Sequence, residues 1–138
     1  MKKLRDIAEI RNHLEDIVAN LAIKRISGKM LEEMRVRLQN IENAVQEENV
    51  TRFAVEEANL HNLLYTATGN IALKEFIESQ YNLFTRIWFT VERTHIDLTE
   101  QLNDWQSIYQ ALCEKDKEKA AESNKKHFEK YFNHLKSI

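Results

Sequence analysis

The sequence has very few residues that interrupt helices. Its 138 residues include no proline and only two glycines, Gly28 and Gly69. Proline and glycine are the strongest local breakers of regular structure, so their scarcity favours long helices joined by short connections. Strand patterns are also missing. We therefore predict an all-α fold: one domain over residues 1–138, built as an antiparallel bundle of six to seven helices around a central ligand pocket.

Cysteine and long apolar runs are scarce as well. The single cysteine, Cys113, excludes an internal disulfide and fits a reducing compartment. Asp6, Glu9 and Arg11 interrupt the apolar core that a signal peptide needs, and there is no uncharged run of about 18 residues that would span a membrane. We therefore expect a cytoplasmic protein without a membrane segment.

The sequence also lacks an excess of either basic or acidic residues. The 20 basic and 22 acidic residues give a net charge of −2, which produces no general field to attract nucleic acid or an anionic membrane. The usual enzyme signatures, such as a nucleophile with its base or a glycine-rich phosphate loop, are also not found. The composition therefore favours local binding of a small partner, and we expect no enzyme activity.

Apolar spacings of three and four residues place the helices. We predict them over residues 4–26, from a break at 27–28 onward, between an N-cap at Asn49 and an end at 68–69, over 70–93, over 98–113, and from an N-cap at Asp116 to the C-terminus. The expected core stripe of the first helix comprises Leu14, Ile17, Val18 and Leu21. The aromatic helix at 70–93, which includes Phe76, is expected at the centre of the bundle.

Glu57 breaks the apolar pattern of the third helix. It shares a helical stripe with Phe53 and Leu60, so a carboxylate stands where a core position is expected. An unpaired buried carboxylate is costly. His61 follows four residues later on the same face, so both side chains can converge on one small object such as a metal ion. A polar strip on the last helix, containing Asn124, His127 and Tyr131, points a second histidine inward.

Two arginines are candidates for gripping an effector carboxylate. Arg11 lies on the first helix, and Arg86 lies on the fourth among aromatic residues. A guanidinium in such a setting can hold a carboxylate through two parallel hydrogen bonds. Arg86 fits equally well in a structural ion pair or with its head in solvent.

Taken together, these segments resemble the FadR C-terminal domain family, the sensor module of many GntR-type transcription regulators. The resemblance is carried by Glu9-Ile10-Arg11, Leu14-Glu15, Leu21-Ala22, Phe53, Glu57 with His61, and Ala67-Thr68-Gly69-Asn70. It implies a divalent metal of the Zn, Mn or Ni type, for which the ligand positions are Glu57, His61 and His127. The family's middle histidine position falls on Trp105.

Trp105 leaves two outcomes open. Three protein ligands with water or an effector carboxylate still make a workable open metal site. Alternatively, Trp105 fills the cavity, Glu57 and His61 hydrogen-bond each other, and the pocket binds a more apolar or aromatic effector. The candidate effector-binding residues are therefore Arg11, Arg86, Trp105, Asn124 and Tyr131.

The resemblance implies a dimerising sensor domain that binds a small organic acid and controls DNA binding allosterically. We expect a homodimer whose contact with DNA requires a winged-helix domain that these 138 residues do not include. Two other readings stay open. A helical-bundle metalloenzyme would need more inward carboxylates than Glu57. A purely structural dimerisation module would place Glu57 and His61 at a subunit interface.

Overall fold

The chain forms an all-α bundle, as the sequence predicts. The structure is a computed structural model and describes residues 2–80 and 97–136. Its helices are α1 (Lys2–Arg25), α2 (Gly28–Gln46), α3 (Val50–Ala67), α5 (Leu98–Glu114) and α6 (Lys117–Lys136), and residues 71–80 are helical as well. No strand occurs within the described ranges. None of the described helices combines the length and the apolar character needed to cross a membrane.

Side-chain caps and one glycine set the helix ends. The Ser27 hydroxyl accepts a hydrogen bond from the Met30 amide at the start of α2, and the Asn49 side chain caps α3 in the same way. Asp116 caps α6 through the Lys119 amide. Gly69 follows α3 with a φ of 63°, a left-handed conformation that glycine adopts without steric cost. The predicted boundaries at these positions are confirmed.

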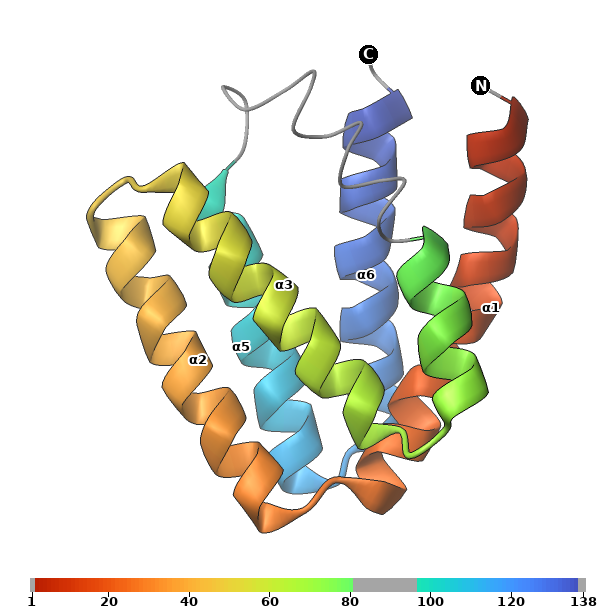
Figure 1. The fold of residues 1–138 in the computed structure, drawn as a ribbon, viewed down its shortest axis with the longest axis horizontal. Coiled ribbons are helices and arrows are strands. Elements are labelled where there is room, and N and C mark those ends of the chain that lie inside the picture. Colours follow the sequence, from red (N-terminus) through yellow and green to blue (C-terminus); the bar gives the residue numbers. More distant parts are fainter. Residues whose placement is uncertain (1, 81–96, 137–138) are drawn as a thin grey trace.

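The helices pack as antiparallel neighbours around an apolar core. Figure 1 shows α1 beside α6, α2 beside α3, and α5 running behind α3 between α2 and α6. The largest fully buried apolar side chains are Met34, Ile41, Leu60, Leu64, Ile77, Trp105, Ile108 and Leu112. The inner faces of α1, α3, α5 and α6 therefore meet, and the polar residues on those faces are forced together.

The buried face of α1 agrees with the predicted one at Val18, which is fully buried, but not throughout. Ile17, an expected core residue, is 44 % exposed, whereas Arg11 and Glu15 are buried. The helix turns this charged pair inward because the two side chains neutralise each other, and small alanines on the same face let α1 approach its neighbours. Phe76 is 45 % exposed, so this residue of the expected central aromatic helix is not in the core. The remainder of that predicted helix, 81–93, lies outside the described residues.

Candidate metal centre

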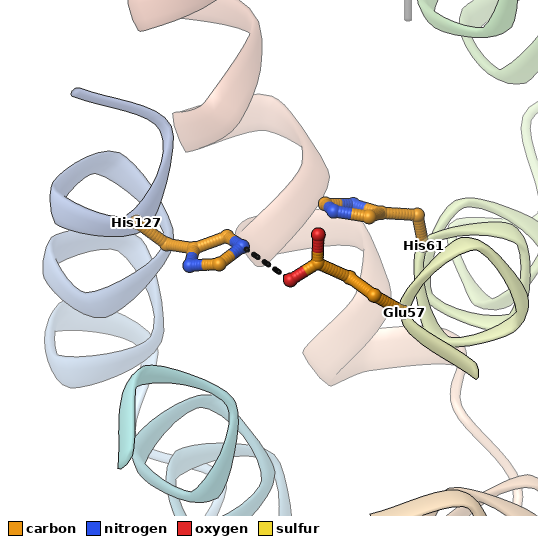
Figure 2. A group of neighbouring side chains, drawn as sticks. All are labelled: Glu57, His61 and His127. Carbon is orange, nitrogen blue, oxygen red and sulfur yellow. Dashed lines mark ion pairs between the residues drawn. The ribbon is translucent and has the colours of Figure 1, made fainter. Parts of the chain in front are cut away.

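Three side chains of metal-ligand type converge from two helices. Glu57 and His61 lie one turn apart on α3, and His127 faces them from α6 (Figure 2). One donor atom from each residue lies within 4.8 Å of the other two. The helical spacing that places Glu57 and His61 on one face is thus realised, and the structure brings all three residues together.

Glu57 lies almost completely out of water. Its Oε2 accepts a hydrogen bond of 3.1 Å from Trp105 Nε1 and lies 3.7 Å from His127 Nε2. Burial raises the pKa of Glu57, and the nearby His127 and the Trp105 hydrogen bond oppose that rise. A carboxylate in this setting gains much from a cation, because little water competes for its charge.

The surroundings of His61 favour its neutral imidazole form. Removal from water lowers the pKa of His61 well below its ordinary value, and electrostatic interactions with the nearby His127 and Arg11 lower it further. The Tyr65 hydroxyl oxygen lies 3.3 Å from His61 Nδ1 and accepts a 3.2 Å hydrogen bond from Arg11 Nη2. Neutral imidazole is the form that binds metals, so the surroundings of His61 favour ligation.

His127 is held from its other side by an acid on α5. Its Nδ1 lies 3.3 Å from Asp104 Oδ2, while Lys130 Nζ donates to Asp104 Oδ1 over 2.9 Å. Burial acts to raise the pKa of Asp104, but the hydrogen bonds from His127 and Lys130 outweigh it and leave the pKa lowered. Asp104 is therefore an ionised partner for His127.

Trp105 lies inside the cluster. It is fully buried, and its ring centroid lies 4.7 Å from that of His61 and 5.2 Å from that of His127. The indole N–H of Trp105 donates to the Glu57 carboxylate, so Trp105 is a hydrogen-bond partner of Glu57 that the sequence analysis did not name.

The donor set fits a divalent transition metal. Ligand bonds of about 2.1 Å in tetrahedral geometry separate neighbouring donor atoms by about 3.4 Å. The 3.7 Å between His127 Nε2 and Glu57 Oε2 is close to that spacing. The donor nitrogen of His61 lies within 4.8 Å of the other two donor atoms, so only a modest side-chain shift is needed to complete the set. One carboxylate with two imidazoles suits Zn, Mn or Ni and leaves room for further ligands.

A second polar cluster lies beside the first. The Nε and Nη2 of Arg11 donate to Glu15 Oε1 over 3.2 and 2.6 Å, and Asn124 donates to Glu15 Oε2. The Arg11 guanidinium also stacks over the Phe128 ring, 4.6 Å from its centroid. Its Nη1 is buried without a hydrogen-bond partner among the described residues. Arg11 and Tyr65 connect this cluster to His61.

The sequence-based site and the observed site overlap but differ. Arg11, Trp105 and Asn124 lie in or beside the cluster, whereas Arg86 and the side chain of Tyr131 lie outside the described residues. Glu15, Tyr65 and Asp104 were not predicted. The spacing of four between Arg11 and Glu15, in phase with Ala8 and Ala22, is the signal that could have identified the buried ion pair.

Comparisons with known proteins agree with this architecture. The chain has the fold of E. coli McbR/YncC, with a TM-score of 0.86 and 18 % identity over 99 % of this chain and 69 % of that one. No curated protein sequence matches significantly. The sequence profile of the FCD domain matches residues 6–130. FCD domains are regulatory effector-binding domains rather than enzymes. Because the match spans nearly the whole sequence, the chain belongs to the FCD domain family.

Proposed function

We propose that this domain is the ligand-sensing, dimerising part of a cytoplasmic GntR/FadR-type transcription regulator, and that it binds a small organic acid on a divalent metal. One observation carries the proposal. Glu57, His61 and His127 place a carboxylate and two imidazoles within 4.8 Å of one another on the inner faces of α3 and α6. Family membership in the FCD domains supports the regulatory role.

The surroundings of the triad support a metal role. Ligands of a protein-bound metal are commonly oriented by further hydrogen bonds. Glu57 has Trp105 as its partner and His127 has Asp104. A bound metal would supply a Lewis-acidic centre for an effector carboxylate, while the protein residues set its orientation and exclude water.

Arg11 is the proposed second anchor for the effector. The buried Nη1 has no partner among the described residues and can donate to an anion. Arg11 also lies close to the triad, since Tyr65 contacts both Arg11 and His61. An acid with two polar ends could therefore meet the metal at one end and the guanidinium at the other. Asn124, which donates a hydrogen bond to Glu15, would help to position the groups at the guanidinium end of the site.

Effector binding would change how helices from different parts of the bundle pack. The triad joins α3 to α6, and the Arg11 cluster joins α1 to both. An acid that binds one packing more tightly shifts the population towards it, and a dimer converts the shift into a new spacing of two DNA-binding domains. DNA contact itself is assigned to a winged-helix domain of the regulator, because a net charge of −2 offers no attraction for phosphates.

Calorimetric titration of candidate mono-, di- and tricarboxylic acids tests the proposal. The metal-loaded protein should bind at least one acid, chelator should abolish that binding, and Arg11→Lys should weaken it because lysine cannot reproduce the guanidinium geometry. Lys24→Gln, an exposed change near the end of α1, serves as the matched control. Complete indifference to every acid and every metal would contradict the sensor role.

Self-association is tested separately. The proposed homodimer is supported by apolar side chains that are exposed in the single chain, including Ile10 and Ile17 on one side of α1. Light scattering coupled to size-exclusion chromatography should give twice the chain mass of 16.4 kDa. A monomeric mass at all accessible concentrations would remove dimerisation from the proposal and leave the ligand site unaffected.

A further inference from the structure

His127 uses its two ring nitrogens in opposite directions. Nε2 lies 3.7 Å from Glu57 Oε2, inside the triad, and Nδ1 lies 3.3 Å from Asp104 Oδ2, outside it. The His127 side chain is buried, so its orientation is fixed by these neighbours rather than by water. Asp104 is on α5, whereas the three residues of the triad are on α3 and α6.

Asp104 is itself held in place. Lys130 Nζ donates to Asp104 Oδ1 over 2.9 Å and also lies 2.9 Å from Glu100 Oε1. One oxygen of the Asp104 carboxylate is thereby occupied by Lys130, and the other is directed at the His127 ring. Glu100 forms an ion pair with Lys130, whereas Asp104 is the acid that contacts His127, so substitutions at the two positions separate their roles.

The chemistry of this pair determines which nitrogen carries the proton. An ionised carboxylate only accepts hydrogen bonds, so a neutral His127 beside Asp104 has its proton on Nδ1. The lone pair is then on Nε2 and faces Glu57. A histidine fixed in this way is ready to bind a metal, with no tautomer change and no ring rotation.

We infer that Asp104 is a positioning residue, which holds His127 in the Nδ1–H tautomer with Nε2 directed into the Glu57–His61–His127 triad and thereby raises the affinity of the site for a divalent metal. This inference rests on the proposed function for its metal, but the tautomer exists in the metal-free protein. α5 thus takes part in the site through Asp104, although it supplies no ligand.

Two measurements on the full chain test the inference. The first is long-range ¹H–¹⁵N NMR of the metal-free protein, with the His127 signals assigned through His127→Gln. The wild type should show the Nδ1–H tautomer, Asp104→Asn should largely keep it because the amide oxygen still accepts, and Asp104→Ala should shift His127 towards the Nε2–H form. A wild-type His127 that is mainly Nε2–H, or a tautomer unchanged in Asp104→Ala, overturns the inference.

The second measurement is calorimetric titration with Zn²⁺ and Ni²⁺ at a pH where imidazole is neutral. Asp104→Ala should weaken metal binding about 10- to 100-fold, and Asp104→Asn by less. Glu100→Gln, the matched control, should change the affinity less than about threefold, because an exposed ion pair contributes little. Equal affinities in all four proteins would overturn the inference, and a thermal melt of each metal-free variant verifies folding.

The outcomes separate this inference from the proposed function. A wild type that binds no divalent metal refutes the metal-dependent function and the affinity claim together. The tautomer of His127 in the same sample still decides whether Asp104 positions the ring. A wild type that binds metal with an affinity indifferent to Asp104 refutes the inference and leaves the proposed function standing.

Discussion

Trp105 donates its indole N–H to Glu57 Oε2 over 3.1 Å, and its ring packs against both histidines of the triad. This residue occupies the place where the FadR-type resemblance puts a ligating histidine, and here it serves as a hydrogen-bond donor to a ligand-type carboxylate. The two outcomes considered from the sequence, a filled cavity or an open three-residue site, are therefore not exclusive. Trp105 fills space and orients Glu57 at once.

Replacing Trp105 with histidine should strengthen metal binding. The new imidazole would lie beside Glu57, His61 and His127 and complete a set of four ligands. One added ligand should raise the Zn²⁺ affinity by about tenfold or more, which competition with a chromophoric chelator measures. The metal-free variant should lose about 3 kcal/mol of stability, because a smaller side chain replaces a buried indole. Unchanged or weaker affinity would mean that position 105 does not face the metal.

Replacing Trp105 with phenylalanine tests the hydrogen bond instead. The ring is kept and the donor is lost, so the buried Glu57 carboxylate loses a partner at a cost of about 1–3 kcal/mol. Metal affinity should fall about tenfold, because the ligand is no longer oriented. Denaturant unfolding of the metal-free protein gives the first quantity and calorimetry the second. A variant equal to the wild type in both would show that the Trp105–Glu57 contact has no energetic role.

The Arg11–Glu15 pair should behave as a buried ion pair. Arg11→Met or Glu15→Leu alone leaves an uncompensated charge on the inner face of α1, which should cost about 3–5 kcal/mol of unfolding free energy. The double variant should recover most of that loss, because it removes both charges. Additive losses in denaturant unfolding would contradict the pairing. Arg35→Met with Glu32→Leu, an exposed pair on α2, is the matched control.

Acid should destabilise the metal-free protein through His61. The pKa of His61 is lowered in the folded chain, so below its ordinary value of 6.5 the unfolded state binds more protons. The stability contributed by neutral His61 is present above pH 6.5 and is lost as the pH falls towards the folded pKa. His61→Gln should flatten this part of a pH series of urea titrations in chelator. An identical slope in both proteins would refute the lowered pKa.

Glu57 has the opposite effect on how the stability of the metal-free protein depends on pH. The raised pKa of Glu57 means that the folded state holds this proton more tightly than the unfolded state. The contribution of Glu57 to the free energy of unfolding therefore falls as the pH rises above 4.5.

The two glycines should respond differently to alanine. Gly69 has a φ of +63°, and an added Cβ would lie 3.0 Å from Arg25 Cδ, so Gly69→Ala should lower stability by about 1–2 kcal/mol. Gly28 begins α2 with open space around the added Cβ, so Gly28→Ala should be neutral or stabilising by about 0.5 kcal/mol. Thermal melts of the two variants measure the difference, and equal destabilisation would contradict the conformational argument.

The helices could be predicted because the signals that define them are local. Asn49, Asp116 and Gly69 act on amides and carbonyls within a few residues, and their roles are legible in the chain itself. Glu57 and His61 could be paired for the same reason, since they share one helix face. His127 came from its position on a polar strip and from the family resemblance.

The remaining contacts depend on how helices pack. Trp105 and Glu57 are 48 residues apart, and Asn124 and Glu15 are 109 apart, so no periodicity relates them. On α1 the prediction was wrong for Ile17, which is exposed although it is more apolar than Glu15, and Glu15 is buried by its pairing with Arg11. Tertiary pairing of charges overrode the hydrophobic pattern at that position.

The metal content of the purified protein, after loading with Zn²⁺, Mn²⁺ or Ni²⁺ and removal of excess ion, tests the central claim most directly. The wild type should retain about one ion per chain, and Glu57→Gln should lose it while staying folded, because the amide oxygen still accepts from Trp105. His13→Gln, at an exposed position of α1, should retain the ion. A wild type without metal, or a Glu57→Gln variant that keeps as much as the wild type, would contradict the account.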